Sequence, residues 1–388
     1  MKENLQKTAA FFSNGLVYGL NGIYLIIPLF LSKYFNSVQS GYLLAIQPLL
    51  LCIAPLFWGG VTDKAKNQNV VMIFLLLISS LSILSLRLSS NFIFVGVALT
   101  LFAFFQAPYG SLIDVLTIKT AEKFRTNYGI YRITGSVGYA VFAYLITLLS
   151  DTDDFVYIYL VVALLGALSV AAMNKVETKI KKVKKSSGDA KKLLNNKELW
   201  LLVGILAAGF FTWGYYTSFF PTYITETLGL KKSVWGIVAF LTAFSELPFF
   251  IYYGKIFEKI SMRTIVSFSC FVMVLRWLAF ATVKNAAVLI GISFITGMFI
   301  TVLTYCVTFY IVSVISHGLI NRAQSLMYAV GTGITKVLAG CIGGYMTEYL
   351  SEPVSFIICA AISLLAMIVA LVCKKTMDSI DEKIRRYR

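Results

Sequence analysis

An acid, a base and an aromatic ring follow one another closely in a strongly apolar part of the chain. Asp114 lies near the end of one apolar stretch, Arg132 lies inside the next, and Tyr139 follows Arg132 by about two helical turns. A charge at hydrocarbon depth is costly unless it meets water or an opposite charge, so such residues are commonly functional. The three residues predict a site for a polar solute, in which the charges bind hydroxyl groups and Tyr139 stacks on an apolar face. The alternative is that Asp114 and Arg132 only hold two helices together.

Two antiparallel helices must bring these residues together. A turn over 119–127 joins the stretch that carries Asp114 to the one that carries Arg132, so both can lie at similar depth as a charge pair. Small residues let a neighbouring helix approach closely. The arginine is followed by three of them, Gly135, Ser136 and Gly138.

The composition places the chain in a membrane. Of its 388 residues, 58% are hydrophobic and only 13% are charged, and the mean hydropathy is +0.80. These values, with apolar segments along the whole length, exclude a soluble protein and a protein with one membrane anchor. The first apolar segment follows a short polar start and is too long for a cleavable signal.

Twelve apolar segments are separated by short polar loops. The predicted spans are 8–32, 39–61, 69–89, 92–116, 128–150, 155–174, 198–221, 233–254, 263–283, 286–315, 322–347 and 353–373. The lysine-rich stretch 175–197 reads as a solvated linker between two halves, 1–174 and 198–373, and 374–388 as an amphipathic tail on the inner leaflet. The predicted fold is an all-α membrane protein with twelve transmembrane helices in two six-helix bundles.

The distribution of the 34 Lys and Arg residues predicts the orientation. If both termini lie in the cytoplasm, few basic residues fall in outer loops: Lys33, Arg87, Lys231, Lys232 and Lys284. Three others lie inside spans, at Arg132, Arg276 and Lys336, and the rest lie in inner loops and tails. The positive-inside rule therefore predicts cytoplasmic termini. We expect the protein in the cell (plasma) membrane, as a multi-pass protein of the cell inner membrane. Contact with anionic lipid explains the net charge of +16 without nucleic acid.

A short motif follows the second span and recurs after the eighth. Each copy has a glycine at a helix end and then an acid and a base: Gly59, Asp63 and Lys64, and Gly254, Glu258 and Lys259. The glycine permits tight helix packing, and the charges can cap or bridge helix ends on the inner face. A six-helix half repeated about an axis normal to the membrane is the plan of major facilitator transporters.

The eighth span contains a carboxyl group among aromatic residues. Glu246 is flanked by Phe244, Phe249 and Phe250. Desolvation favours the protonated form of a carboxyl group, which suits a residue that binds and releases a proton. The alternative is a static ion pair with Arg276 of the ninth span.

Two further positions have open interpretations. Lys336 lies midway along a glycine-rich eleventh span, and it faces a water-filled cavity, pairs with Glu246 or meets an anionic solute. Tyr18, Asn21 and Tyr24 recur on one face of the first span. They line a cavity or pack as aromatic residues, and Tyr24 is included among the candidate substrate-binding residues.

The chain resembles the oligosaccharide:proton symporters of the major facilitator superfamily, the lactose permease type, with their phenylpropionate and nucleoside permease relatives. The resemblance covers nearly the whole length and is most specific from Asp114 to Tyr139. It implies that Asp114, Arg132 and Tyr139 bind the solute, with tyrosine in place of the family's tryptophan. Glu246, Arg276 and Lys336 resemble the family's charged residues in spans eight, nine and eleven.

The chain departs from the family pattern in two places. The family's histidine and glutamate of the tenth span fall near Ile300 and Leu303, and the aspartates of its seventh span are absent. Proton coupling, if it follows this resemblance, must therefore depend on Glu246 or Asp114.

These observations predict a secondary active transporter that imports a small polar organic solute, a sugar or glycoside, by alternating access with proton symport. Asp114 and Arg132 bind the solute, Tyr139 stacks on it, and Glu246 with Arg276 gates or carries the proton. Three intramembrane cations against two acids favour, as an alternative, an organic or aromatic acid, and a nucleoside is also considered. Multidrug efflux and a nontransporting solute sensor rank lower.

An enzyme is not expected. The chain has one histidine, and its six cysteines have no metal-type spacing, so catalytic and metal-binding groups are not gathered. We expect no cofactor and no metal. The expected partners are a small-molecule substrate, a proton and membrane lipid, with the protein itself a monomer.

Overall fold

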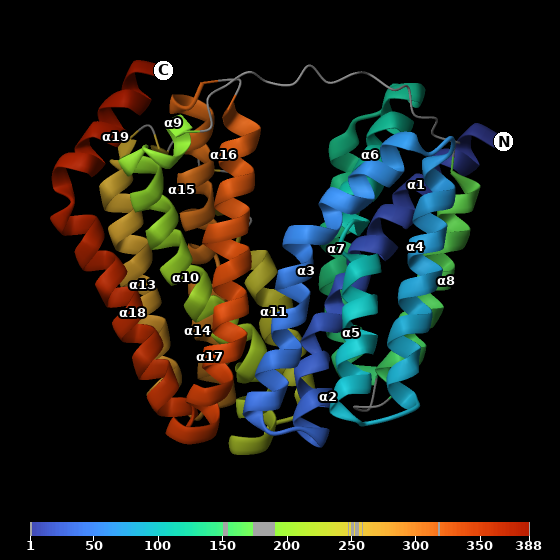
Figure 1. Ribbon diagram of the computed structural model, residues 1–388, viewed down its shortest axis with the longest axis horizontal. Coiled ribbons are helices and arrows are strands. Elements are labelled where there is room, and N and C mark those ends of the chain that lie inside the picture. The colour runs from blue at the N-terminus through green and yellow to red at the C-terminus, as the bar shows by residue number, and fades with distance from the viewer. Residues whose placement is uncertain are drawn as a thin grey trace. The chain divides into compact units, whose positions relative to one another are not determined.

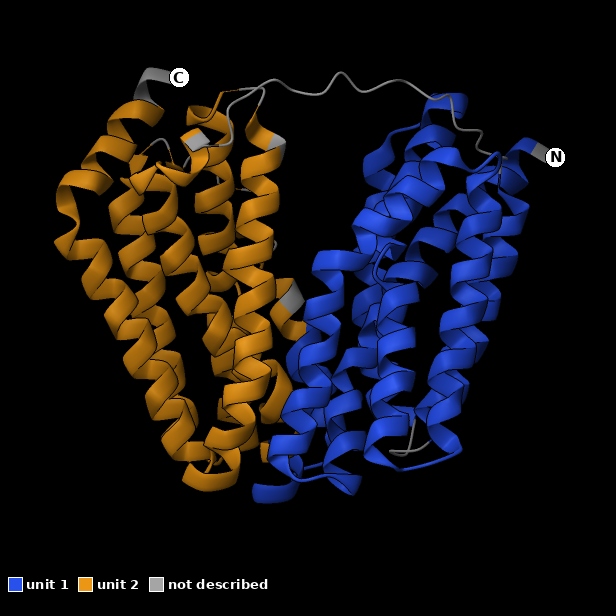
Figure 2. Cartoon of the chain, in the orientation of Figure 1, with its two compact units in different colours: residues 1–182, 224–240 blue, residues 183–223, 241–388 orange. Residues whose placement is uncertain are grey.

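The structure, a computed structural model, describes residues 2–149, 154–173, 191–246, 248–249, 252, 256–257, 259–316 and 319–387. Every regular element in these ranges is a helix (Figure 1). By its internal contacts the chain divides into two compact units (Figure 2), residues 1–182 with 224–240 and residues 183–223 with 241–388. The segment 224–240, predicted in the second half, groups with the first unit. The linker boundary stays a prediction, because residues 174–190 lie outside the described ranges.

Several helices of the first unit begin at asparagine residues that cap them. The helices are α1 (Lys2–Gly19), η1 (Leu20–Leu25), α2 (Ile27–Tyr34), α3 (Ser37–Lys64), α4 (Gln68–Leu84), η2 (Ser85–Arg87), α5 (Phe92–Gln106), α6 (Tyr109–Phe124), α7 (Tyr128–Leu149) and α8 (Phe155–Ala172). The side chains of Asn36, Asn67 and Asn91 accept hydrogen bonds from backbone N–H groups in the first turns of α3, α4 and α5. Such caps satisfy donors that a helix cannot pair internally.

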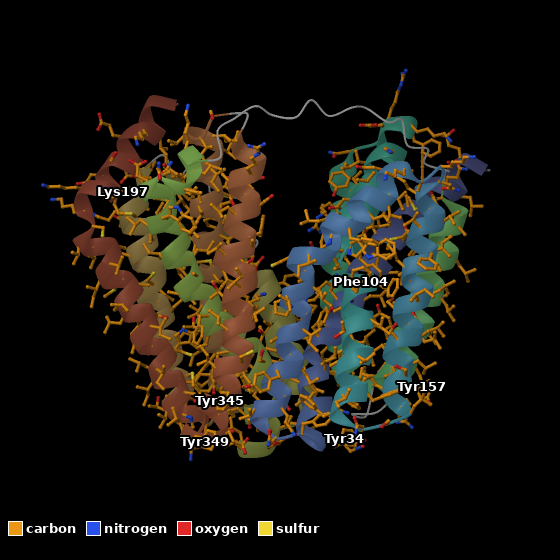
Figure 3. All side chains as sticks on the ribbon, in the orientation of Figure 1. Tyr34, Phe104, Tyr157, Lys197, Tyr345 and Tyr349 are labelled. Carbon is orange, nitrogen blue, oxygen red and sulfur yellow. The ribbon has the colours of Figure 1, made fainter. Side chains whose placement is uncertain are left out.

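A proline interrupts the span formed by α5 and α6. Pro108 has no N–H group, so the carbonyl oxygen of Phe104 loses its helical partner. The indole Nε1 of Trp58 in α3 donates to that oxygen at 3.0 Å. Phe104 lies about midway along the first unit (Figure 3), so the interrupted backbone is paired by a side chain where no water is expected.

Helices α1 and α7 touch through their backbones. A Cβ atom added at Gly138 would lie 2.1 Å from the carbonyl oxygen of Gly15, and one at Gly135 would lie 2.7 Å from Cδ2 of Tyr18. The predicted close approach of a helix to the small residues after Arg132 is confirmed, and the neighbour is α1.

Exposed aromatic residues mark one end of the first unit. Tyr34 and Tyr157 lie at this end (Figure 3), and both side chains are exposed. The guanidinium carbon of Arg87 lies 5.7 Å from the ring centroid of Tyr157. Tyrosine with a nearby cation is typical of the membrane–water interface.

The second half of the chain contains two π-helical segments among its α-helices. The elements are α9 (Lys191–Leu194), α10 (Lys197–Thr222), η3 (Tyr223–Thr227), α11 (Lys232–Ser245), α13 (Met262–Thr282), α14 (Ala286–Thr296), α15 (Phe299–Val314), α16 (Ile320–Leu326), η5 (Met327–Ile334), α17 (Thr335–Leu350), α18 (Glu352–Val372) and α19 (Lys374–Tyr387). The π-helical segments are η3 and η5.

The predicted fold class is confirmed. Eleven helices in the described part of the chain are long and apolar enough to cross a membrane. The eighth predicted span, 233–254, begins as the apolar helix α11, and several of its later residues lie outside the described ranges. The fourth runs over Phe92–Phe124, beyond its predicted end at residue 116.

The structure changes the interpretation of the repeated motif. Within the described residues of the first unit, no atom lies within 4 Å of a Cβ atom added at Gly59, so the expected tight packing is not seen inside this unit. Asp63 and Lys64 are exposed residues at the end of α3. Lys64 lies in the last turn, where its positive charge interacts favourably with the helix dipole. In the second copy Lys259 is exposed, whereas Gly254 and Glu258 lie outside the described residues.

The C-terminal helix α19 packs on protein. Its apolar side chains Met377, Ile380 and Ile384 are buried within the second unit, so the prediction that this face lies on lipid is wrong. An amphipathic pattern indicates only that one face needs an apolar partner, and here the partner is the bundle.

A buried acid joins α19 to α10. Glu198, in the first turn of α10, accepts hydrogen bonds from Lys383 Nζ at 2.6 Å, Ser379 Oγ at 2.8 Å and Tyr310 Oη at 2.7 Å. Asp381 Oδ1 in turn accepts the backbone N–H of Met262 at 2.6 Å, at the start of α13. The tail thus connects the beginnings of two spans.

The replacement Gly138→Ala should lower the thermal stability of the detergent-solubilised protein. Its methyl group would overlap the carbonyl oxygen of Gly15, and overpacking of this kind costs about 1–3 kcal/mol. Gly204→Ala is the control, because no atom of the described chain lies within 4 Å of the added Cβ. Equal melting temperatures for the two variants would contradict a backbone contact between α1 and α7.

The replacement Lys383→Gln should also lower the melting temperature. Glu198 would lose its cation while staying buried, at a cost of roughly 1 kcal/mol after allowance for the partly exposed lysine. Lys375→Gln, at an exposed position of the same helix, should leave the melting temperature unchanged. A loss of stability in the control alone would contradict the described contact.

Candidate functional site

Both oxygens of Asp114 are engaged by tyrosine hydroxyl groups. Tyr18 Oη, from α1, donates to Oδ2 at 2.9 Å, and Tyr128 Oη, from the first turn of α7, donates to Oδ1 at 2.8 Å. Hydrogen bonds to a carboxylate are stronger than those between neutral groups. Asp114 lies in α6, ten residues before the end of the helix at Phe124, and is half-buried.

Arg132 contacts the aromatic ring of Tyr18. Its guanidinium carbon lies 4.3 Å from the ring centroid of Tyr18, and the arginine side chain is exposed. No ion pair within 4.0 Å joins Arg132 to Asp114 in the described part of the chain, so the predicted direct charge pair is wrong. Tyr18 links the two charges instead, with its hydroxyl on the acid and its face on the base. We call Tyr18, Asp114, Tyr128 and Arg132 the polar cluster.

The sequence signals for the two tyrosines differ in strength. Tyr128 precedes Arg132 by four residues, which is about one helical turn, so their shared face could have been predicted. Tyr18 was recognised only as one of several polar residues on the first span. Its place depends on which face of α1 meets the glycines of α7.

The two other tyrosines predicted for this site lie in different surroundings. Tyr139 is half-buried in α7, two turns after Arg132. Tyr24, in η1, donates its hydroxyl to Oε1 of Gln106, and its ring packs against Phe102 with centroids 6.0 Å apart. The structure therefore includes Tyr24 in the packing between the first and fourth spans.

In the second unit, Glu246 and Arg276 are not joined to each other. Glu246, at the end of α11, accepts a hydrogen bond from Thr301 Oγ1 at 2.8 Å. Among the described residues no ion pair within 4.0 Å connects it to Arg276, so the alternative of a static ion pair is not seen. Thr301, which the sequence did not single out, lies in α15.

Arg276 lies inside a group of aromatic rings and is only 1% exposed. Its guanidinium carbon is 5.0 Å from the ring centroid of Trp213, 4.5 Å from Tyr216, 5.2 Å from Trp277 and 5.1 Å from Phe280. We call these four rings the aromatic cage. Trp213 and Tyr216 come from α10, and Trp277 and Phe280 come from α13.

Lys336 also contacts a ring. Its Nζ atom lies 5.3 Å from the ring centroid of Phe210 in α10, and no ion pair involves it in the described chain. It is the second residue of α17, the helix that directly follows the π-helical segment η5. Such π-helical turns are frequent at functional sites.

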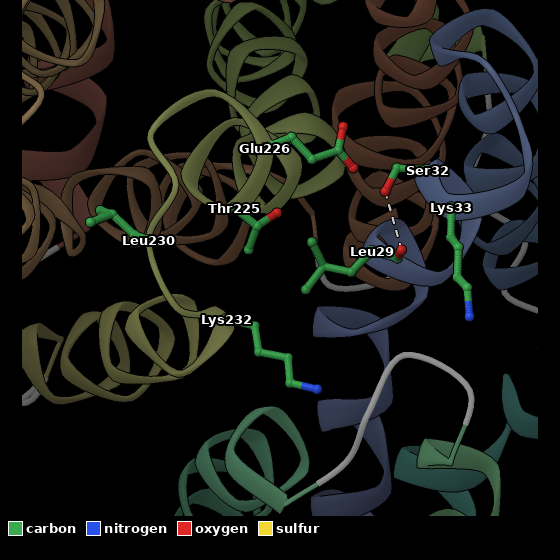
Figure 4. Close-up of a pocket in the computed structure, with 7 residues that line it drawn as sticks. All are labelled: Leu29, Ser32, Lys33, Thr225, Glu226, Leu230 and Lys232. Carbon is green, nitrogen blue, oxygen red and sulfur yellow. Dashed lines mark hydrogen bonds between the residues drawn. The ribbon is translucent and has the colours of Figure 1, made fainter.

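A pocket of about 410 Å³ lies in the first unit, where α2 approaches the connection between α10 and α11 (Figure 4). It is lined by Leu29, Ser32, Lys33, Thr225, Glu226, Leu230 and Lys232. None of the candidate residues from the sequence lines it. In the described part of the chain, no group of three or more His, Cys, Asp or Glu residues could hold a metal ion.

Spanning helices and polar residues within them are typical of a multi-pass transporter. The chain belongs to the MFS_1 like family, whose model matches residues 22–358. It is therefore a transporter of the major facilitator superfamily for a small molecule, and not an enzyme.

Similar proteins agree with this class. The chain is 22% identical to the uncharacterized transporter YwbF of Bacillus subtilis (strain 168), over 86% of this chain and 84% of that one. It is 23% identical to the maltose permease of Geobacillus stearothermophilus, over 96% and 94% of the two chains. A crystal structure of a variant of the nucleoside transporter NupG shares the fold with a TM-score of 0.83 at 15% identity, over 96% and 99% of the chains.

The replacement Tyr18→Phe should keep the ring under Arg132 and remove the hydrogen bond to Asp114. The expected loss is roughly 1.5 kcal/mol, as for a hydrogen bond to a charged group. Thermal unfolding of Tyr18→Phe, Asp114→Asn and the double variant measures this coupling. Tyr157→Phe, at an exposed position of α8, is the control. Strictly additive effects would contradict the bond between Tyr18 and Asp114.

Proposed function

We propose that the protein is a secondary active transporter that imports a small polar organic solute, a sugar or glycoside, by alternating access. The polar cluster within the first unit is the observation that carries this proposal. An acid and a base held at one place inside membrane-spanning helices match the hydroxyl groups of such a solute. The relative named as a maltose permease supports a sugar as the substrate class.

The geometry suggests how the cluster would bind. Tyr18 and Tyr128 orient the carboxylate of Asp114, while the exposed guanidinium of Arg132 offers N–H donors to solute oxygens. Tyr139 lies two turns along the same helix, where its ring would stack on the apolar face of the solute. Tyr24 supports the position of η1.

We propose proton symport with Glu246 as the group that carries the proton. The side chain is half-buried, no cation pairs with it in the described chain, and Thr301 donates a single hydrogen bond to it. A carboxyl group with few stabilising partners exchanges a proton more readily than one held in an ion pair. Arg276 would act in gating, and Asp114 is the second candidate for coupling.

An organic or aromatic acid, or a nucleoside, is the alternative substrate. Arg132, Arg276 and Lys336 exceed the two intramembrane acids Asp114 and Glu246 by one charge. The fold likeness to a nucleoside transporter is compatible with a nucleoside. In the acid alternative Lys336 would contribute to solute binding.

The remaining assignments are also proposals. Domain boundaries at 1–174, 175–197, 198–373 and 374–388, with both termini in the cytoplasm of the plasma membrane, follow from the linker and the basic loops. Membrane lipid surrounds a monomer. The charged ends of the repeated motif would lie on the inner face.

The replacements Asp114→Asn and Arg132→Ala should abolish ligand binding while the fold is retained. The ligand is the compound that most stabilises the wild-type protein in a thermal-shift screen of sugars, nucleosides and organic acids. Arg87→Ala, far from the cluster in sequence and at an exposed position, is the control and should bind normally. Wild-type affinity in both site variants would reduce the polar cluster to a structural role.

Uptake of the same labelled ligand into liposomes tests the transport proposal. We expect uphill accumulation with an inward proton gradient and none without it, and the Glu246→Gln variant should equilibrate its ligand without accumulating it. Equal accumulation with and without the gradient would contradict proton symport, but it would not contradict the proposed binding site.

A further inference from the structure

The aromatic cage around Arg276 solves only part of the problem of burying a cation. Each ring face attracts the charge of the desolvated guanidinium. Ring faces do not supply the acceptor oxygens that its N–H groups need. A buried donor without an acceptor destabilises the folded protein.

Two nitrogen atoms of Arg276, Nε and Nη2, are buried and have no acceptor for their N–H groups in the described chain. The Nε–H bond and one Nη2–H bond are parallel and form one edge of the guanidinium. That edge is the one that grips the two oxygens of a carboxylate in a bidentate pair. The indole Nε1 of Trp277, whose ring belongs to the same cage, likewise has no partner among the described residues.

We propose that the Nε–Nη2 edge of Arg276 binds the carboxylate group of an organic acid that the protein transports. The inference rests on the proposed transport function; it favours the organic-acid alternative over a sugar and gives Arg276 a binding role in place of gating. The aromatic cage favours an acid with a planar or apolar body, which the rings can contact. The singly charged carboxylate neutralises the single charge of the guanidinium, whereas a phosphate group would leave excess negative charge among ring faces.

The cage has one wall that can admit a ligand. Tyr216, Trp277 and Phe280 are each at most 1% exposed, whereas Trp213 is only half-buried. In this proposal the Trp213 side chain, whose ring centroid lies 5.3 Å from that of Tyr216, rotates to uncover the guanidinium. Binding is therefore coupled to a movement of Trp213.

The competing occupant of this edge is the carboxylate of Glu246. It belongs to the same unit and is bonded to Thr301 in the structure. If Glu246 pairs with Arg276 in another conformation, an added acid would gain nothing over its neutral amide. The comparison of acid and amide therefore separates the two sources of a carboxylate.

Thermal shifts of the full-length protein in detergent test the proposal. The probes are a panel of aromatic and aliphatic carboxylates at constant ionic strength, each paired with its primary amide and, where one exists, its phosphate ester. We expect at least one acid to stabilise the wild-type protein while its amide does not. No acid exceeding its amide, or a phosphate ester exceeding its acid, would overturn the proposal.

Variants then locate the site. Arg276→Lys keeps a cation in the cage and removes the bidentate edge, so affinity for the acid should fall about tenfold or more. Arg263→Gln, on the same helix and paired with Asp378 at 3.4 Å, is the matched control and should bind normally. Undiminished affinity in Arg276→Lys, or acid preference appearing only in Glu246→Gln, would overturn the assignment.

A second measurement leaves Arg276 unchanged. Titration of the wild-type protein with the acid should change the intrinsic tryptophan fluorescence, and most of that change should be absent in Trp213→Phe. An unchanged signal in the wild-type protein would contradict the inference. Acid-specific binding without uptake would contradict only the proposal of transport. Uptake without a preference for the acid would contradict only the assignment of a carboxylate to Arg276.

Discussion

The site in the first unit depends on a contact between two backbones. Because Gly15 and Gly138 have no side chains, α1 and α7 approach until an added carbon atom would overlap a carbonyl oxygen. At that separation the ring of Tyr18 fits against Gly135 and extends to Asp114. Larger residues at the glycine positions would separate the helices and withdraw the tyrosine from both charges. The small residues therefore determine the geometry of the charged ones.

Aromatic rings, not acids, accompany the three cations inside the spans. Arg132 lies over Tyr18, Arg276 lies within its cage and Lys336 lies over Phe210. A ring face attracts a cation without neutralising it, so each group keeps its charge and much of its hydrogen-bonding capacity. A permanent ion pair would neutralise the charge and occupy the hydrogen-bond donors. This arrangement suits a protein whose charges must meet a partner during only part of a cycle.

Hydropathy and charge position were sufficient to predict the membrane class and the helical fold, because both are properties of single segments. Asp114 and Arg132 could be selected on the same basis, and Tyr128 follows from its spacing along α7. The position of Tyr18 could not be predicted, because it depends on which faces of two helices meet. The apolar face of α19 was assigned to lipid for a similar reason, since Met377 and Ile380 need an apolar surface of either kind.

The bond between Glu198 and Lys383 has a consequence for the order in which the protein is made. The two residues are 185 positions apart, with the acid at the start of the second unit and the lysine near its end. During translation, Glu198 is synthesised long before Lys383, its cationic partner. Five further spans separate Glu198 from Lys383, and the carboxylate gains its cation only when α19 arrives. Closure of this end of the second unit therefore follows the insertion of α18.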